Sequence, residues 1–179
     1  MEDIKNKYIA QPLKVLQIHK ILKKITQNYE KELIETYELI NETLNFLKSK
    51  ANNIGRKPLI LFNMAAVYLI ILFEGFNKQF FKAAANFVYY EDEISFEKKY
   101  NKSYKLKEEI IEGAFGIDLK REFKQWEHIE KLHEARNQVT HNIKDIPEHS
   151  IIEISYHAVK EYFQFIQEKV IAFIETTKE

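Results

Sequence analysis

Three polar side chains near residue 140 are of types that could do chemistry together. Arg136 and Asn137 are adjacent, and His141 follows Asn137 by four residues. A histidine, with an ordinary pKa of about 6.5, can accept and donate protons at neutral pH. An arginine is permanently charged and offers a fork of donors that suits phosphate and carboxylate groups. The group could therefore hold an anionic substrate and move protons on it, with Asn137 orienting either partner.

The spacing decides which of these side chains can meet. In a helix, Asn137 and His141 share one face because they are four residues apart. Arg136 and His141 are separated by about 140° around the axis. They converge only if the arginine wraps around the helix, if the helix loosens before Ile143, or if two copies of the segment meet. The third alternative would place two arginines and two histidines in one cleft.

Arg136 is also expected to point inward, which requires a negatively charged partner. At about 100° per residue it shares a side with the apolar residues of its helix, Ile129, Leu132, Val139 and Ile143. A buried charge without a partner costs several kcal/mol. Between residues 51 and 90 Glu74 is the only acidic residue, and Asn63 and Asn77 fall near its azimuth. We predict a polar seam of Asn63, Glu74 and Asn77, with Glu74 facing Arg136.

Each of these residues also has a plainer interpretation. Arg136 could form a structural salt bridge with Glu74, which is compatible with catalysis but does not require it. His141 could be a histidine at a helix C-terminus that the helix dipole stabilises. Asn137 could simply face solvent. For His141, the neighbouring pair Arg136 and Asn137 favours the functional interpretation over the structural one.

Metal and cofactor sites are not expected. Glu130 and His133 have the spacing of a di-iron bundle, but such a site needs a second pair and two more glutamates. A zinc-protease helix would have its second histidine where Asn137 stands. The chain has no cysteine, which excludes disulfides and thiolate ligands. The sequence therefore predicts neither a metal ion nor a cofactor.

Two long helices precede the motif. The first is predicted from Pro12 to about Lys50, because apolar residues recur in steps of three and four: Leu22, Ile25, Tyr29, Leu33, Tyr37, Ile40, Leu44 and Leu47. The second is predicted from Pro58 to about Tyr90 and is apolar nearly all round, as a membrane span would be. Asn63 interrupts its apolar stretch, which stops at Glu74. We therefore predict a central helix covered on several sides and no membrane contact.

A polar connector at 91–104 is expected next, followed by a short helix over 105–111 that ends at Gly113 and Gly116. These two glycines punctuate the chain just before the motif helix.

The motif helix is predicted to start at the N-cap Asp118 and to continue to about Ile143. Pro147 opens the last helix, or Ser150 caps it. No alternating strand pattern or repeat is present. The sequence thus predicts an all-α, up-and-down helical bundle of about five helices. It would be a single domain over 1–179, with the core and motif region at 58–176.

The composition sets wider limits. Hydrophobic residues make up 45% and charged residues 30% of the 179 residues, which suits a folded core. The first residues carry no signal-peptide pattern, so the cytoplasm is the expected compartment. The 27 basic and 27 acidic residues balance. This argues against a general nucleic-acid coat but is compatible with one local positive site.

The segment Arg136-Asn137-Gln138-Val139-Thr140-His141 resembles the signature of the HEPN superfamily. That signature is arginine, a polar residue that is often asparagine, a few variable residues and then histidine. The family is an all-α bundle with the motif near the end of a long helix. A preceding helix carries an acidic residue among apolar ones, which Glu74 and its neighbours resemble. The resemblance covers roughly residue 58 to the C-terminus.

The resemblance implies a metal-independent endoribonuclease that works as a homodimer, as a toxin or an antiviral defence effector. His141 would move protons, Arg136 would hold the phosphate, Asn137 would orient one of them, and Glu74 would support the site. The expected partners are RNA and an antitoxin or another protein. The alternative is a non-catalytic HEPN module that binds RNA, nucleotide or a partner protein.

One departure from the family concerns control. Some HEPN toxins are paired with a nucleotidyltransferase antitoxin that modifies a tyrosine just after the motif histidine. Here Asn142, Ile143 and Lys144 follow His141, and no tyrosine occurs before Pro147. That form of control is therefore not expected.

Overall fold

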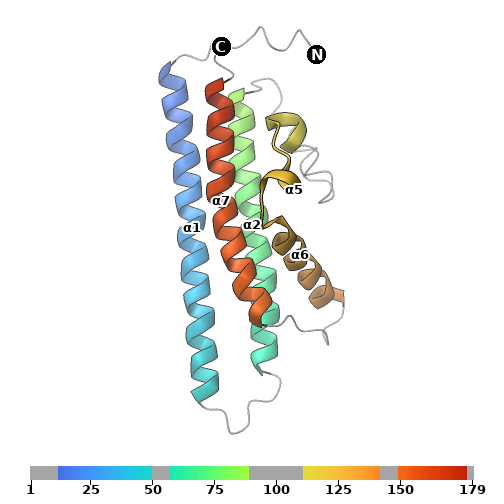
Figure 1. The fold of residues 1–179 in the computed structure, drawn as a ribbon. Coiled ribbons are helices and arrows are strands. Elements are labelled where there is room, and N and C mark those ends of the chain that lie inside the picture. The colour runs from blue at the N-terminus through green and yellow to red at the C-terminus, as the bar shows by residue number, and fades with distance from the viewer. Residues whose placement is uncertain (1–11, 50–56, 89–110, 142–148, 177–179) are drawn as a thin grey trace.

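The computed structural model describes residues 12–49, 57–88, 111–141 and 149–176. Within these ranges every regular element is helical (Figure 1): α1 (Pro12–Ser49), α2 (Lys57–Val88), α5 (Leu119–Glu122), α6 (Trp126–His141) and α7 (His149–Thr176), with a further helical stretch at 111–115. The long helices run alternately down and up the molecule. The prediction of an all-α, up-and-down bundle is confirmed.

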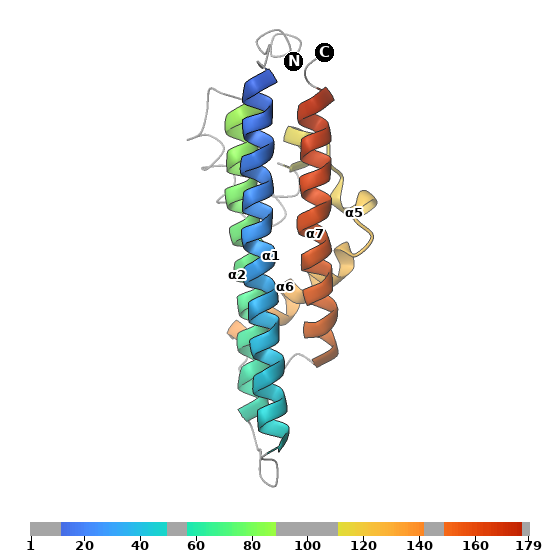
Figure 2. The same cartoon turned by 90° about the vertical axis from the view of Figure 1, so that its left-hand side faces the viewer.

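Three long helices form one side of the bundle. α1, α2 and α7 each contact the other two, while α6 packs on α2 and α7. Figures 1 and 2 place α6 on the far side of the bundle from α1. One cluster of buried side chains joins α1, α2, α5, α6 and α7. The two outermost helices therefore present separate surfaces.

The predicted bounds of α1 and α2 are confirmed to within two residues at each end. On α1, the buried residues recur at helical spacing: Val15, Ile18, Leu22, Leu33, Ile40 and Leu44. α1 approaches α2 closely at Gly75, where an added Cβ would lie 2.9 Å from the hydroxyl oxygen of Tyr29. The ring of Tyr29 packs edge-on against both Phe76 and Phe163, at 5.8 and 6.1 Å between centroids. Glycine at position 75 makes room for that ring.

α2 is the central helix that the sequence predicts, since it contacts α1, α6 and α7. Its segment Leu61–Val88 is long and apolar enough to cross a membrane by length and composition, and 44% of its most apolar window is buried within the fold. Aromatic side chains of α2 and α7 form the centre of the core, all fully buried: Phe73, Phe76, Phe80, Phe81, Tyr162 and Phe163. α6 packs against this core.

The region before α6 differs from the prediction. The short helix extends to residue 115 rather than ending near Ile111, and Gly116 terminates it with a φ of +67°. The Gly116 amide donates to the carbonyl of Glu112 at 2.8 Å, which closes the last turn. Gly113 lies within the helical stretch and does not end it. Residues 89–110, which include the predicted connector, lie outside the described part of the chain.

The long motif helix predicted from Asp118 is also wrong, because it is two helices. Asp118 does act as an N-cap, but of the four-residue α5. Phe123 is extended, with φ −99° and ψ +103°, and α6 begins after a turn at Trp126. Both aromatic side chains are buried, 5% and 4% exposed. The extended Phe123 separates α5 from α6, and both rings contact Tyr162 of α7, at 5.6 and 6.1 Å between centroids.

The structure tests one of the two predicted starts of α7. His149 is already helical, so the prediction that Ser150 is the N-cap is wrong. The alternative, a start at Pro147, and the predicted end of the motif helix at Ile143 lie outside the described residues. The last described helical residue is Thr176.

Candidate functional site

The candidate site lies at the C-terminal end of α6. This helix is anchored by Trp126, Ile129, Leu132 and Ala135, which are all at most 5% exposed. Because these residues pack on α2 and α7, the end of α6 has a defined position relative to the core. The motif begins at the next residue, Arg136.

Arg136 and Asn137 are in direct contact. The Nη1 atom of Arg136 donates a hydrogen bond of 3.0 Å to Oδ1 of Asn137. Arg136 is half-buried and Asn137 is exposed. The guanidinium therefore lies at the edge of the buried stripe, turned toward the neighbouring amide rather than into the core. Asn137 holds the cation where an incoming anion could reach it.

Glu74, the predicted partner of Arg136, is half-buried on α2. Among the described residues, no ion pair joins these two side chains, and Glu74 is engaged in an interaction of its own. The contact between α2 and α6 brings the two helices together without this pair. A role for Glu74 in supporting the site stays a prediction.

The seam predicted on α2 includes Asn63 and Asn77, whose surroundings differ. Asn77 is 4% exposed, and its Oδ1 accepts a hydrogen bond of 2.8 Å from the hydroxyl of Tyr162 on α7. The amide oxygen of Asn63 is buried, and no donor in the described part of the chain reaches it. Asn77 is therefore bound to α7 across the contact between α2 and α7, and a seam that also includes Asn63 and Glu74 stays a prediction.

His133 is a residue near the site that the motif does not include. It is half-buried, and its ring packs edge-on against Phe73 at 5.7 Å between centroids. His133 precedes Asn137 by four residues, as Asn137 precedes His141. All three therefore follow one face of α6. This four-residue spacing is the signal by which the sequence could have pointed to His133.

His141 is the last residue of α6. Its side chain lies outside the described residues, so its predicted approach to Arg136 stays a prediction. Within the described residues, no three histidine, aspartate or glutamate side chains are grouped as metal ligands.

No protein-family model matches the chain, and no curated protein or solved structure is significantly similar to it. The resemblance to the HEPN superfamily therefore depends on the motif, on Glu74 and on the all-α fold. The activity that this resemblance implies belongs to a proposal.

Proposed function

We propose that the chain is a metal-independent endoribonuclease of the HEPN type, acting as a homodimer in the cytoplasm as a toxin or a defence effector. The observation that carries this proposal is the hydrogen bond from Arg136 to Asn137, at the end of α6 and one turn before His141. It orients a permanent cation on the helix that also carries His141.

The chemistry uses the RNA's own 2′-hydroxyl as the nucleophile. A histidine removes the hydroxyl proton, the oxygen bonds to the adjacent phosphorus, and the bond from phosphorus to the 5′-oxygen breaks. A second proton goes to the departing oxygen. Arg136 offsets the charge that builds on the phosphate oxygens. The products are a 2′,3′-cyclic phosphate and a 5′-hydroxyl.

A dimer supplies what one helix lacks. On a single α6, Arg136 and His141 are about 140° apart. Two copies of the segment in one cleft would provide two histidines, one for each proton, and two arginines for the phosphate. Asn137 would then position the cation of its own chain.

The test is incubation of the purified protein with total cellular RNA in the presence of EDTA. The wild type is expected to produce fragments with 2′,3′-cyclic phosphate ends. His141→Ala and Arg136→Ala are each expected to lower the cleavage rate by about 100-fold or more. His128→Ala, on the same helix, and Arg121→Ala, with 78% of its side chain exposed, are the matched controls and should cleave like the wild type.

The outcomes separate the proposal from its alternatives. Cleavage at the parental rate by His141→Ala overturns the nuclease proposal. RNA binding without cleavage, weakened by the same substitutions, assigns a non-catalytic HEPN module. If neither binding nor cleavage occurs, and thermal melts show that Arg136→Ala is strongly destabilising while His141→Ala is not, the motif serves the stability of the bundle alone.

A further inference from the structure

The charges of α1 are separated along its length. Residues 12–29 contain four lysines and no acidic residue, whereas residues 30–47 contain five glutamates and one lysine. Most of these side chains are exposed. α1 therefore has a positive half and a negative half, although the chain as a whole is neutral. Two copies of such a helix are complementary in charge when they lie antiparallel.

The same helix exposes large apolar side chains in both halves. Leu16 and Ile21 are 53% and 49% exposed in the basic half, and Leu39 and Phe46 are 64% and 61% exposed in the acidic half. α2 adds three beside the acidic half: Met64, Tyr68 and Ile71, at 64%, 37% and 56%. Of these residues, Leu39, Met64 and Tyr68 line one groove, and an exposed apolar patch of this kind marks a protein contact.

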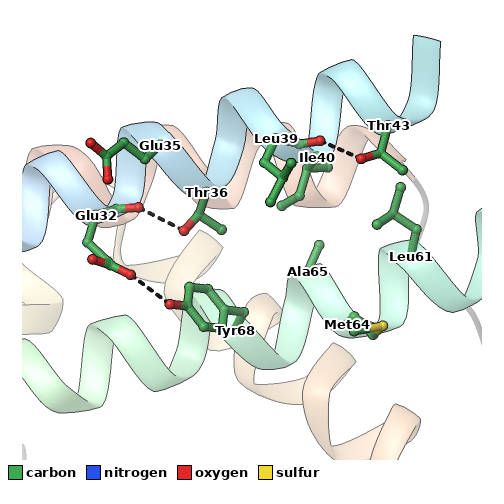
Figure 3. Close-up of a pocket in the computed structure, with 10 residues that line it drawn as sticks. All are labelled: Glu32, Glu35, Thr36, Leu39, Ile40, Thr43, Leu61, Met64, Ala65 and Tyr68. Atoms are coloured by element: carbon green, nitrogen blue, oxygen red, sulfur yellow. Dashed lines mark hydrogen bonds between the residues drawn. The ribbon is translucent and has the colours of Figure 1, made fainter. Parts of the chain in front are cut away.

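A groove runs between α1 and α2 in this region (Figure 3). It has a volume of about 530 Å³ and an apolar floor: Leu39, Ile40, Leu61, Met64 and Ala65. Glu32 and Glu35 line it as well, and the hydroxyl of Tyr68 donates to Oε1 of Glu32 at 2.8 Å. That hydrogen bond to a carboxylate raises the pKa of Tyr68, which keeps the hydroxyl protonated. The groove suits a helix that offers apolar and basic side chains together.

The basic half of α1 offers such a surface. Exposed residues recur along one stripe of α1 in steps of three and four: Ile21, Lys24, Asn28, Lys31, Glu35, Leu39, Glu42 and Phe46. This is the period of a helix-to-helix contact. If two copies of the stripe are laid antiparallel about a two-fold axis near its middle, Lys24 meets Glu42 and Ile21 meets Phe46. Lys31 then meets Glu35.

We propose that a second copy of this chain docks antiparallel along α1, with its basic half over the acidic half of the α1–α2 groove. From Ile21 to Phe46 the stripe is about 39 Å long. With Met64, Tyr68 and Ile71 at its side, the contact buries on the order of 1,000 Å², near the lower limit for a specific interface. The pairing is symmetric and closed at two copies, because the basic half of each copy covers the acidic half of the other.

This interface is independent of the proposed nuclease cleft. α1 and α6 lie on opposite sides of the bundle (Figures 1 and 2), so the α1 contact leaves the motif face open. A chain that uses both faces would form a tetramer or a larger assembly. The α1 contact can therefore be tested whether or not the chain cleaves RNA.

Charge reversal tests the pairing of the two halves. Sedimentation velocity on the full chain should show that Lys24→Glu or Glu42→Lys weakens self-association at least about tenfold, because like charges then face each other. The double variant Lys24→Glu with Glu42→Lys should restore it. Glu168→Lys, at an exposed position on α7, is the control and should associate like the wild type. Circular dichroism confirms that each variant is folded.

Cysteine cross-linking tests the direction of the two helices. The chain has no cysteine of its own. In an antiparallel pair, Glu35→Cys lies near its own copy across the axis and should form a disulfide-linked dimer under mild oxidation. Glu42→Cys lies far from its own copy and should not, whereas a parallel pair would link both.

Three results would overturn the proposal. The first is a wild type that stays monomeric at all concentrations. The second is an assembly that both single reversals leave unchanged. The third is a double reversal that fails to restore association. If Lys24→Glu reduces a tetramer to a dimer, that supports the α1 interface, and the remaining dimer is the one through the motif.

Discussion

At the scale of single residues, the contact between Arg136 and Asn137 joins two neighbours in the chain. Neighbours on a helix point in different directions, so the long arginine side chain must turn sideways to reach the amide. After this one hydrogen bond, the guanidinium still has further N–H donors that could bind a phosphate. In the proposed mechanism Asn137 is therefore a positioning residue, and Arg136 contacts the phosphate.

This arrangement predicts different effects for two substitutions of Asn137. Asn137→Ala removes the acceptor that orients the guanidinium, and we expect the rate of RNA cleavage to fall about tenfold, since a misplaced cation stabilises the transition state less. Asn137→Asp adds a negative charge beside Arg136 and should weaken RNA binding as well. Single-turnover rates and RNA binding curves measure both effects. Equal rates for the wild type and both variants would remove Asn137 from the mechanism.

A second prediction at this scale concerns the buried pair Tyr162 and Asn77. Tyr162→Phe leaves the amide of Asn77 buried without its donor, which should lower the free energy of unfolding by about 1–3 kcal/mol. Tyr68→Phe removes a hydrogen bond at a position with 37% exposure, so its effect should stay within about 0.5 kcal/mol. Urea unfolding followed by circular dichroism compares the two. Equal losses would mean that water satisfies Asn77.

The sequence could predict which residues form the motif but not which residues their neighbours contact. Arg136, Asn137 and His141 are close in the chain, so helical spacing alone relates them. Asn77 was placed correctly on α2, yet its partner is 85 residues away on α7. The helical pattern locates Asn77 on a buried side without saying which helix covers that side. The pairing of Asn77 therefore required the packed structure.

At the scale of elements, proline marked the starts of both long helices and Gly55 follows the end of α1. The end of α2 has neither glycine nor proline near it, and its prediction depended on the polar residues that begin at 91. The break between α5 and α6 contains neither residue type. Phe123 and Trp126 on its two sides are buried and have the spacing of one helix face, so the sequence pattern does not reveal the break.

Two glycines before α5, Gly113 and Gly116, predict opposite effects of the same substitution. Gly113→Ala should raise stability by about 0.5–1 kcal/mol, since the position is helical and nothing lies within 4 Å of an added Cβ. Gly116→Ala should lower stability by about 1 kcal/mol, because a φ of +67° disfavours a side chain. Thermal melts of the two variants check this. If both changed stability in the same direction, the stop at Gly116 would be wrong.

The attachment of α5 predicts a pH dependence. Glu122 receives a hydrogen bond from Lys169 of α7 and another from the amide of Asp118, and together these lower the pKa of its carboxyl below the ordinary 4.5. A carboxyl with a lowered pKa in the folded state stabilises the fold above its unfolded pKa. This contribution is lost as the pH falls from about 4.5 through the folded value.

Unfolding midpoints measured in urea at successive pH values test this dependence. The wild type should lose stability below pH about 4.5 more steeply than Glu122→Gln, which cannot titrate. Glu112→Gln, at an exposed position, is the control and should follow the wild type. If Glu122→Gln followed the wild type as well, α5 would be held by Leu119 and its apolar contacts alone.

At the scale of the whole molecule, the bundle separates two surfaces that could each bind a second copy. α1 carries the separated charges on one side, and the end of α6 carries the motif on the other. The core of α2 and α7 lies between them. Contact at one surface thus need not disturb the other, and their effects on assembly and on cleavage can be measured separately.

The last prediction asks whether the motif residues act across two chains. If the cleft combines Arg136 of one chain with His141 of another, mixing the inactive variants Arg136→Ala and His141→Ala should restore part of the cleavage. The cleft of a mixed dimer then holds one arginine and one histidine, which allows only part of the wild-type rate because one of the two proton transfers lacks its histidine. If both residues act within one chain, each chain of a mixed dimer lacks one of them and the mixture stays inactive. Mass spectrometry under native conditions shows whether mixed dimers have formed, so inactivity of a confirmed mixed dimer would exclude the shared cleft. Lys24→Glu in both variants removes the contact through α1, and recovery that persists in this background locates the shared site at the end of α6.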